Sequence, residues 1–80
     1  MDESAFFKEL GKKIKATRES KGLSGVELAH RCDFDKSNLG RIEKGRTKPT
    51  LSTLIKICQA LGIELSDIFL DIKLPEKDIS

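Results

Sequence analysis

The stretch that decides the fold is residues 23–45, LSGVELAHRCDFDKSNLGRIEKG, which contains two short helical patterns separated by a brief break. Leu28, Ala29 and Cys32 share one face of the first pattern, because residues three and four apart lie on the same side of a helix. The second pattern and the break contribute three further apolar residues, Leu39, Ile42 and Phe34. The break is too short for the helices to run apart, so both apolar faces must bury against a common partner.

The start of the first pattern is marked by Ser24 and Glu27, which have the S-x-x-E spacing of a capping box. This spacing predicts a helix over about residues 25–32. Asp33 follows where the chain must turn, and Asp tolerates the left-handed conformation better than most residues.

The second pattern has an expected N-cap at Asp35, a helix over roughly residues 36–44 and a stop at Gly45. Two helices joined by a turn of this length form a helix-turn-helix. The exposed residues of the second helix are basic, polar or small, namely Lys36, Ser37, Asn38, Gly40, Arg41 and Lys44. Such a surface suits an anionic groove.

Before this stretch, one helix is expected over residues 4–20, with a capping hydroxyl from Ser4, acidic residues at Asp2 and Glu3, and a stop at Gly22. Its apolar stripe follows helical spacing and consists of Phe7, Leu10, Ile14 and the methyl group of Thr17.

After it, Thr50 is the expected cap of a fourth helix that Gly62 ends, and residues 63–70 predict a short fifth helix. The stripe of the fourth helix is Leu51, Leu54, Cys58 and Leu61, with Ile57 beside it. Residues 70–74 alternate apolar and polar side chains, which is a weak strand signal. The fold expected is therefore all-α, a compact five-helix bundle, with one domain over residues 1–74 and a frayed tail over residues 75–80.

Composition limits the kind of protein that this can be. The chain has 80 residues, of which 38% are apolar and 35% charged, as in a helix-rich globular domain. No apolar run approaches the roughly 20 residues that span a membrane, and the N-terminus does not resemble a signal peptide. We therefore expect a cytoplasmic protein with Cys32 and Cys58 as reduced core residues.

Charge is divided unevenly along the chain. Residues 1–61 hold 13 Lys or Arg against 8 Asp or Glu, a balance of +5, whereas residues 62–80 hold 2 against 5, a balance of −3. The basic part contains the helix-turn-helix, and a basic surface favours a polyanion such as nucleic acid. Solvation of exposed helices is the alternative explanation.

Neither a metal site nor a catalytic site is expected. His30 and Cys32 are two positions apart and face different sides of a helix, and Cys58 cannot complete a zinc site with them. The sequence has no Gly-rich phosphate loop. We expect no cofactor and no enzymatic activity.

The chain resembles the Cro and phage-repressor type of helix-turn-helix proteins, also called xenobiotic-response-element-like regulators, over about residues 10–70. The matching residues include Leu10-Gly11, Arg18, Gly22-Leu23-Ser24, Glu27-Leu28-Ala29, Arg41-Ile42-Glu43, Gly45, Pro49 and Ala60-Leu61-Gly62. The run FDKSNLGRIE also resembles the recognition helix of restriction-modification controller proteins. The resemblance implies a homodimer on a palindromic operator of double-stranded DNA, with the second helix of the motif in the major groove.

The resemblance also has departures. Gly25 stands where the family usually has a Gln that contacts the DNA backbone, and Asp33 replaces a turn Gly. Gly40 lies within the recognition helix, at a cost of about 1 kcal/mol of helix propensity relative to Ala.

DNA contacts divide into two kinds. Base reading in the major groove needs polar or long side chains near the start of the recognition helix, and the candidates are Lys36, Ser37, Asn38 and Arg41. Contacts to the DNA backbone are expected from Ser24, Gly25, Lys44, Arg46, Thr47 and Lys48. For Arg41 the alternative is a phosphate contact only, and for Lys36 it is solvation or a phosphate contact.

Two further expectations concern structure. Arg18 and Glu43 match a pair that forms a salt bridge in the family. The expected dimer surface lies near the fourth and fifth helices and includes Leu70, Ile72 and Leu74, unless these residues cover their own core. The rival function is a protein-interaction module, antitoxin-like or coactivator-like, in which DNA binding is secondary.

Overall fold

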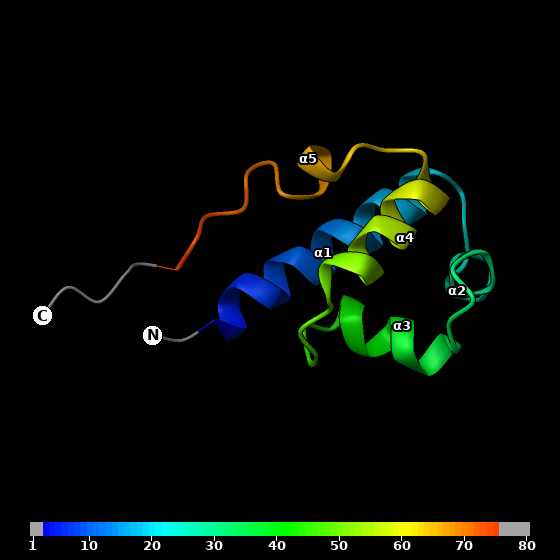
Figure 1. Cartoon of the computed structure of the whole chain (residues 1–80), viewed down its shortest axis with the longest axis horizontal. Helices are drawn as coiled ribbons and strands as arrows, with labels where there is room; N and C mark the ends of the chain where they lie inside the picture. Colours follow the sequence, from blue (N-terminus) through cyan, green and yellow to red (C-terminus); the bar gives the residue numbers. More distant parts are fainter. Residues whose placement is uncertain (1–2, 76–80) are drawn as a thin grey trace, which may run out of the picture.

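The computed structural model describes residues 3–75, and all the regular secondary structure in this range is α-helical (Figure 1). The helices are α1 Ser4–Ser20, α2 Gly25–Arg31, α3 Lys36–Glu43, α4 Leu51–Leu61 and α5 Leu65–Ile68. The predicted all-α fold with a helix-turn-helix is confirmed, with α2 and α3 as its two helices. The predictions for Asp2 and for residues 76–80 lie outside the described part of the chain.

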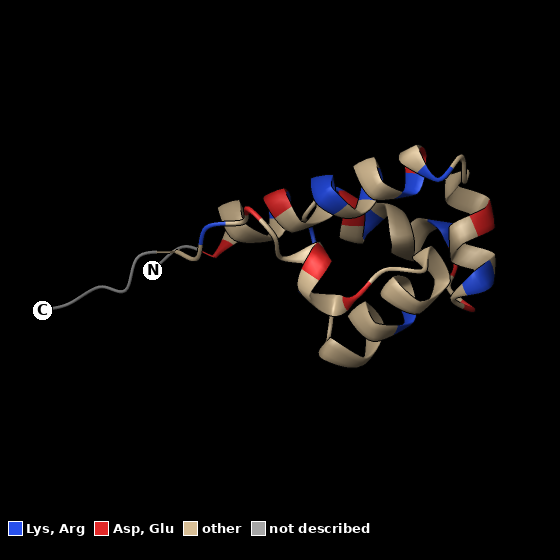
Figure 2. Ribbon diagram, turned by 90° about the horizontal axis from the view of Figure 1, so that it is seen from above, with Lys and Arg blue, Asp and Glu red and all other residues tan. Residues whose placement is uncertain are grey.

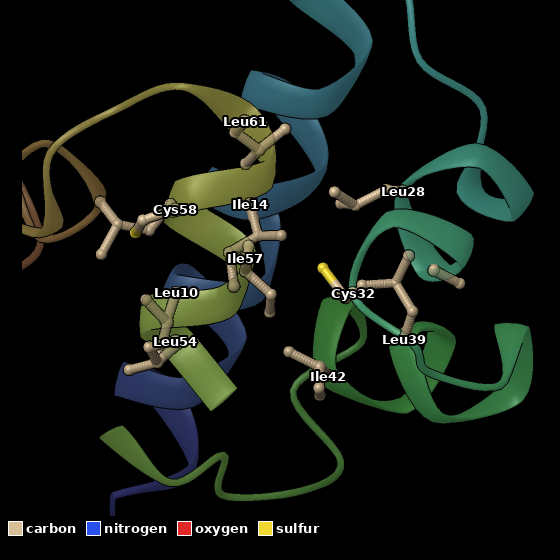
Figure 3. Close-up of a cluster of buried hydrophobic side chains, with 12 residues drawn as sticks. Leu10, Ile14, Leu28, Cys32, Leu39, Ile42, Leu54, Ile57, Cys58 and Leu61 are labelled. Atoms are coloured by element: carbon tan, nitrogen blue, oxygen red, sulfur yellow. The ribbon is translucent and has the colours of Figure 1, made fainter. Parts of the chain in front are cut away.

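Side chains from all five helices meet in one core, most of which Figure 3 shows. The common partner that α2 and α3 require is the pair α1 and α4. Leu10 and Ile14 of α1, for example, point toward the same interior as Leu39 of α3 (Figure 3). The buried apolar residues are Leu10, Ile14, Leu28, Ala29, Cys32, Leu39, Ile42, Leu54, Ile57, Cys58, Leu61 and Ile68. Burying both apolar faces fixes the angle between α2 and α3.

Gly11 allows α1 to lie directly against the end of α3. A Cβ atom at this position would lie 2.4 Å from the carbonyl oxygen of Glu43 and 2.5 Å from that of Ile42. Both are backbone atoms, so they cannot rotate away as a side chain would. The absence of a side chain at Gly11 is therefore a condition for the observed position of α3.

The helix boundaries near the motif agree closely with the expected ones. Ser24 and Glu27 form the capping box, with both N–H to oxygen distances at 3.1 Å. Asp33 has φ of 57°, in the left-handed region. Asp35 is the N-cap residue of α3, but its side chain makes no capping hydrogen bond.

Four expectations for the rest of the chain were wrong. Glu3, not Ser4, is the N-cap of α1, since Ser4 is already the first helical residue. Leu51 is 59% exposed, whereas Ile57 is fully buried, so the buried stripe of α4 passes through position 57. The fifth helix is a single turn, because Gly62 is left-handed and Glu64 is extended, so the helix begins only at Leu65.

The fourth wrong expectation is the strand over residues 70–74, which adopt a turn followed by irregular structure. A strand needs a neighbour to pair with, and the described residues offer no other strand. Ile72 packs against the core, whereas Leu70 and Leu74 are 59% and 73% exposed. The alternation therefore reflects one buried residue between two exposed ones.

Candidate nucleic-acid interface

The exposed face of α3 is a basic surface with a shallow, open depression in it. Successive helical residues are rotated by about 100°, which places positions 36, 37, 40, 41 and 44 on one side of α3. Leu39 and Ile42 occupy the other side, in the core. The depression is lined by Lys36, Ser37, Gly40, Arg41, Lys44 and Arg46. The structure thus brings together three of the four candidate base-reading residues and two of the candidate backbone contacts.

Asn38, the fourth candidate, lies beside the depression rather than in it. Its side chain is half-buried, and its Oδ1 accepts a hydrogen bond from Nη2 of Arg41 at 3.4 Å. At this length the bond is weak. Arg41 can therefore easily exchange this acceptor for another one.

Positive charge is concentrated on α3 and the loop that follows it. Residues 36–48 contain five Lys or Arg against one acidic residue, Glu43, which is paired within the protein. Helix α1 is also basic overall, with five Lys or Arg against two acidic residues, and Figure 2 shows basic and acidic residues on several helices. A polyanion is therefore attracted to α3 and its loop and also to α1, and only the polar surface of α3 distinguishes the two.

Lys48, an expected backbone contact, already has an internal partner. Its Nζ lies 2.9 Å from Oε1 of Glu3 and 5.9 Å from the centre of the Phe7 ring. Glu3 and Lys48 are largely exposed, so solvent and salt weaken this ion pair. The ion pair between Glu3 and Lys48 could not be predicted from the sequence, because the two residues are 45 positions apart. Thr47 lines a second depression, between the start of α1 and the loop, together with Glu3 and Lys48.

The start of α2 carries the remaining candidates, Ser24 and Gly25. The capping box uses the Ser24 hydroxyl and lowers the pKa of Glu27, because its carboxylate accepts hydrogen bonds from the backbone N–H and the side chain of Ser24. Nothing in the protein would contact a Cβ at Gly25. The Glu27 N–H donates to the Ser24 hydroxyl, so the N–H groups of Gly25 and Val26, which have no acceptor within the helix, are the ones that can contact an anion.

The ion pair expected between Arg18 and Glu43 is present and links α1 to the end of α3. Nε of Arg18 donates to Oε2 of Glu43 at 2.8 Å and Nη2 donates to Oε1 at 3.2 Å, while Nη1 donates to the Leu23 carbonyl at 2.9 Å. The two side chains are only 11% and 9% exposed. The hydrogen bonds to Glu43 raise the pKa of Arg18, so this guanidinium remains charged. Its role is to position α3, because its donors point inward.

Three further observations on residues 3–75 concern metal ligands, the cysteines and membrane-spanning helices. No group of three or more His, Cys, Asp or Glu side chains in this range could hold a metal ion. Cys32 and Cys58 are free and buried, and burial raises the pKa of both thiols. No helix in the described range is long and apolar enough to cross a membrane.

Comparison with known proteins gives several close relatives. The chain is 42% identical over 59 residues to the immunity repressor protein of Bacillus phage phi105, covering 74% of this chain and 41% of the repressor. It is 39% identical over 64 residues to the control protein C.MunI of Mycoplasma sp, covering 79% of this chain and 86% of that protein. The chain thus spans less than half of the phage repressor and most of the control protein.

A solved structure shares the fold. The restriction-modification controller protein C.AhdI from Aeromonas hydrophila superposes with a TM-score of 0.80 and 32% identity, covering 81% of this chain and 98% of that one. The helix-turn-helix family model matches residues 14–68, which include all of α2, α3 and α4. The relatives are regulators rather than enzymes, and these matches confirm the resemblance drawn from the sequence. This chain belongs to the helix-turn-helix family of DNA-binding transcriptional regulators.

Proposed function

We propose that this protein is a sequence-specific regulator that binds double-stranded DNA as a homodimer on a palindromic operator. The observation that carries the proposal is the exposed face of α3, where basic and polar side chains surround one depression while the opposite face is fixed in the core. A rigid helix that presents donors on one side fits the major groove, which is wide enough for one helix. Acting on chromosomal or phage DNA would place the protein in the cytoplasm.

In this proposal the interface has two parts with different tasks. Lys36, Ser37 and Arg41 read base edges, since Arg can bond bidentately to guanine and Lys to the same acceptors. Asn38 orients Arg41 and can itself reach the groove wall. The DNA backbone is contacted by Lys44, Arg46, Thr47 and Lys48 on one side and by the start of α2, at Ser24 and Gly25, on the other.

A homodimer would present two copies of α3 to successive turns of the major groove, about 34 Å apart. The two-fold surface that we propose includes Leu70 and Leu74, which are exposed apolar residues of the C-terminal segment. Ile72 contributes less to this surface because it packs against its own core. Contiguous exposed apolar side chains are typical of protein–protein contacts, and Leu70 and Leu74 lie four positions apart on one segment.

Selection of bound sequences from a random pool of duplexes tests the function directly. The expected result is one palindromic consensus, bound at least about a thousandfold more tightly than scrambled DNA at the same salt. The logarithm of the affinity should fall linearly with the logarithm of the salt concentration, with a slope set by the number of phosphates contacted. Equal affinity for the consensus and for scrambled DNA at moderate salt would contradict the proposal and favour a protein-interaction module.

A further inference from the structure

A hollow lies at the centre of the basic face of α3, above Gly40. Positions 36, 40 and 44 are one turn apart along the helix, so Gly40 lies between Lys36 and Lys44. Ser37, Arg41 and Arg46 complete the wall of the depression. All neighbours of Gly40 around the depression have longer side chains, so the surface is lowest where the side chain is missing.

No contact among residues 3–75 requires a glycine at this position. An added Cβ at Gly40 would meet no heavy atom within 4 Å, and its φ is not in the left-handed region. At two other glycines an added Cβ would overlap neighbouring atoms. A Cβ at Gly11 would lie 2.4 Å from a backbone oxygen, and one at Gly45 would lie 2.6 Å from Cα of Lys8. Glycine inside a helix lowers helix propensity, and at Gly40 no internal contact offsets this loss.

The helix backbone at the floor of the hollow is already engaged in hydrogen bonds. The carbonyl oxygen of Gly40 accepts a hydrogen bond from the backbone N–H of Lys44 at 3.0 Å, and its own N–H belongs to the helix. The backbone there has little hydrogen-bonding capacity left for a ligand. Lys and Arg carry their charge at the end of a hydrocarbon stem, so the walls closest to the helix backbone are methylene groups. The hollow therefore suits a small apolar group that approaches between cationic tips.

The DNA major groove offers one such group. Base edges there present hydrogen-bond donors and acceptors, and the only apolar group that projects from them is the C5-methyl group of thymine. We propose that the hollow above Gly40 receives the C5-methyl group of a pyrimidine and so sets the preference at one position of each half-site. The inference rests on the proposed function, since it requires α3 to lie in the major groove. Thymine and 5-methylcytosine share this methyl group, and the experiment distinguishes them.

The test uses the most enriched duplex from the random-pool selection. Each thymine is replaced by uracil and each cytosine by 5-methylcytosine, one position at a time, and dissociation constants are measured for the full-length protein. At one position per half-site, wild type should lose about fourfold in affinity when uracil replaces thymine, the effect of one buried methyl-sized group. If the methyl group belongs instead to a methylated cytosine, 5-methylcytosine should raise the affinity about fourfold at that position.

The variant Gly40→Ala fills the hollow and should abolish this sensitivity, so that methylated and unmethylated duplexes bind equally. Gly25→Ala is the matched control, because it also adds one methyl group to open space, but on α2. It should keep the wild-type ratio between thymine and uracil, whatever its overall affinity. A thermal midpoint for Gly40→Ala at or above that of wild type shows that the variant is folded.

Two results would overturn the inference. One is wild-type protein that is indifferent to methyl removal and methyl addition at every position. The other is Gly40→Ala protein that retains the wild-type sensitivity. In both cases sequence-specific binding would persist, so the proposed function would stand while the methyl pocket fails. If no duplex is preferred over scrambled DNA, both proposals fail together.

Discussion

At the scale of single residues, the pairing of Arg18 with Glu43 makes the sharpest prediction about stability. Both side chains are nearly buried, so removing one leaves the other as an unpaired buried charge. Glu43→Ala should therefore lower the free energy of unfolding by about 3 kcal/mol. Urea denaturation followed by circular dichroism measures this difference.

The matched control is Glu9→Ala, which also removes one carboxylate from an ion pair. Glu9 lies 3.4 Å from Lys12, and both side chains are more than half exposed, so this pair contributes at most about 0.5 kcal/mol. Equal urea midpoints for Glu43→Ala and wild type would show that the buried pair has no net stabilising effect.

Arg41, Arg46 and Lys48 allow base reading to be separated from backbone contact. Arg41→Ala should relax the preference at one base position, because a bidentate contact discriminates by about 1–3 kcal/mol. Arg46→Ala should weaken all sequences alike and reduce the salt slope by about 1. Lys48→Ala should have a smaller effect than Arg46→Ala, because the Lys48 ammonium is already paired with Glu3.

Binding profiles on a randomised operator library, recorded at several salt concentrations, measure all three effects. If Arg41→Ala and Arg46→Ala give profiles of the same shape, the division between reading and positioning is incorrect.

Residue roles were predictable from the sequence where they depend on near neighbours. The capping box of Ser24 and Glu27 and the left-handed Asp33 follow from residues within a few positions. The contact between Glu3 and Lys48 could not be found in this way, because only the tertiary fold brings α1 beside the loop after α3. For Asp35 the predicted position as N-cap residue of α3 was correct, but the sequence could not show that its side chain makes no capping hydrogen bond.

At the scale of helices, glycine decides how closely α1 and α3 can pack. Gly11→Ala should lower the free energy of unfolding by about 1–3 kcal/mol, because the new methyl group would overlap the backbone of Ile42 and Glu43. Gly40→Ala makes the same chemical change in open space and should raise stability by up to about 1 kcal/mol through helix propensity. Thermal and urea unfolding of the two variants test this, and a shift of the same sign in both would contradict the close approach at Gly11.

Glu27, in the first turn of α2, makes the free energy of unfolding of the protein depend on pH. Hydrogen bonds from Ser24 lower the pKa of Glu27 in the folded protein. The stabilisation that the ionised Glu27 carboxylate contributes is therefore fully present above its pKa in the unfolded chain, about 4.3. It is lost as the pH falls through its lower pKa in the folded protein. Glu27→Gln keeps an acceptor oxygen but does not titrate, so the difference in unfolding free energy between wild type and this variant should be constant above about pH 5 and shrink in acid. A difference that does not change between pH 6 and pH 3 would rule out this role.

Helix positions were predictable from apolar spacing over α1 to α4, and at α2 and α4 the capping residues Ser24 and Thr50 agree with that spacing. The face of α4 was harder to assign, since Leu51 and Ile57 are both apolar and only packing decides which one is buried. The close approach at Gly11 had a signal in the sequence, a glycine inside a helical pattern, but that signal does not say which helix comes near.

At the scale of the whole molecule, the segment after α5 was the least predictable part. Residues 70–74 alternate in polarity, yet they have no strand to pair with, and they end as a short irregular segment near α1. Local pattern could not reveal this, because a strand depends on a partner elsewhere in the chain. The same segment holds the two most exposed leucines of α5 and its extension, Leu70 and Leu74.

This segment leads to a prediction about assembly. If Leu70 and Leu74 form the two-fold contact, the double variant Leu70→Ser, Leu74→Ser should dissociate at least about tenfold more readily, because each buried leucine contributes about 1.5–3 kcal/mol. Val26→Ser is the matched control, since Val26 is 57% exposed but lies on α2. It should leave self-association unchanged.

Ile72→Ser separates self-association from folding. Ile72 packs against the core of its own chain, so this change should lower the thermal midpoint, whereas the double leucine variant should leave the midpoint of the dissociated monomer nearly unchanged. Sedimentation velocity over a range of protein concentrations measures the association constant for each variant. A double variant that self-associates as strongly as wild type would place the dimer contact elsewhere on the molecule. If that variant also keeps its affinity for a full palindrome, the C-terminal segment has no part in presenting two copies of α3 to DNA.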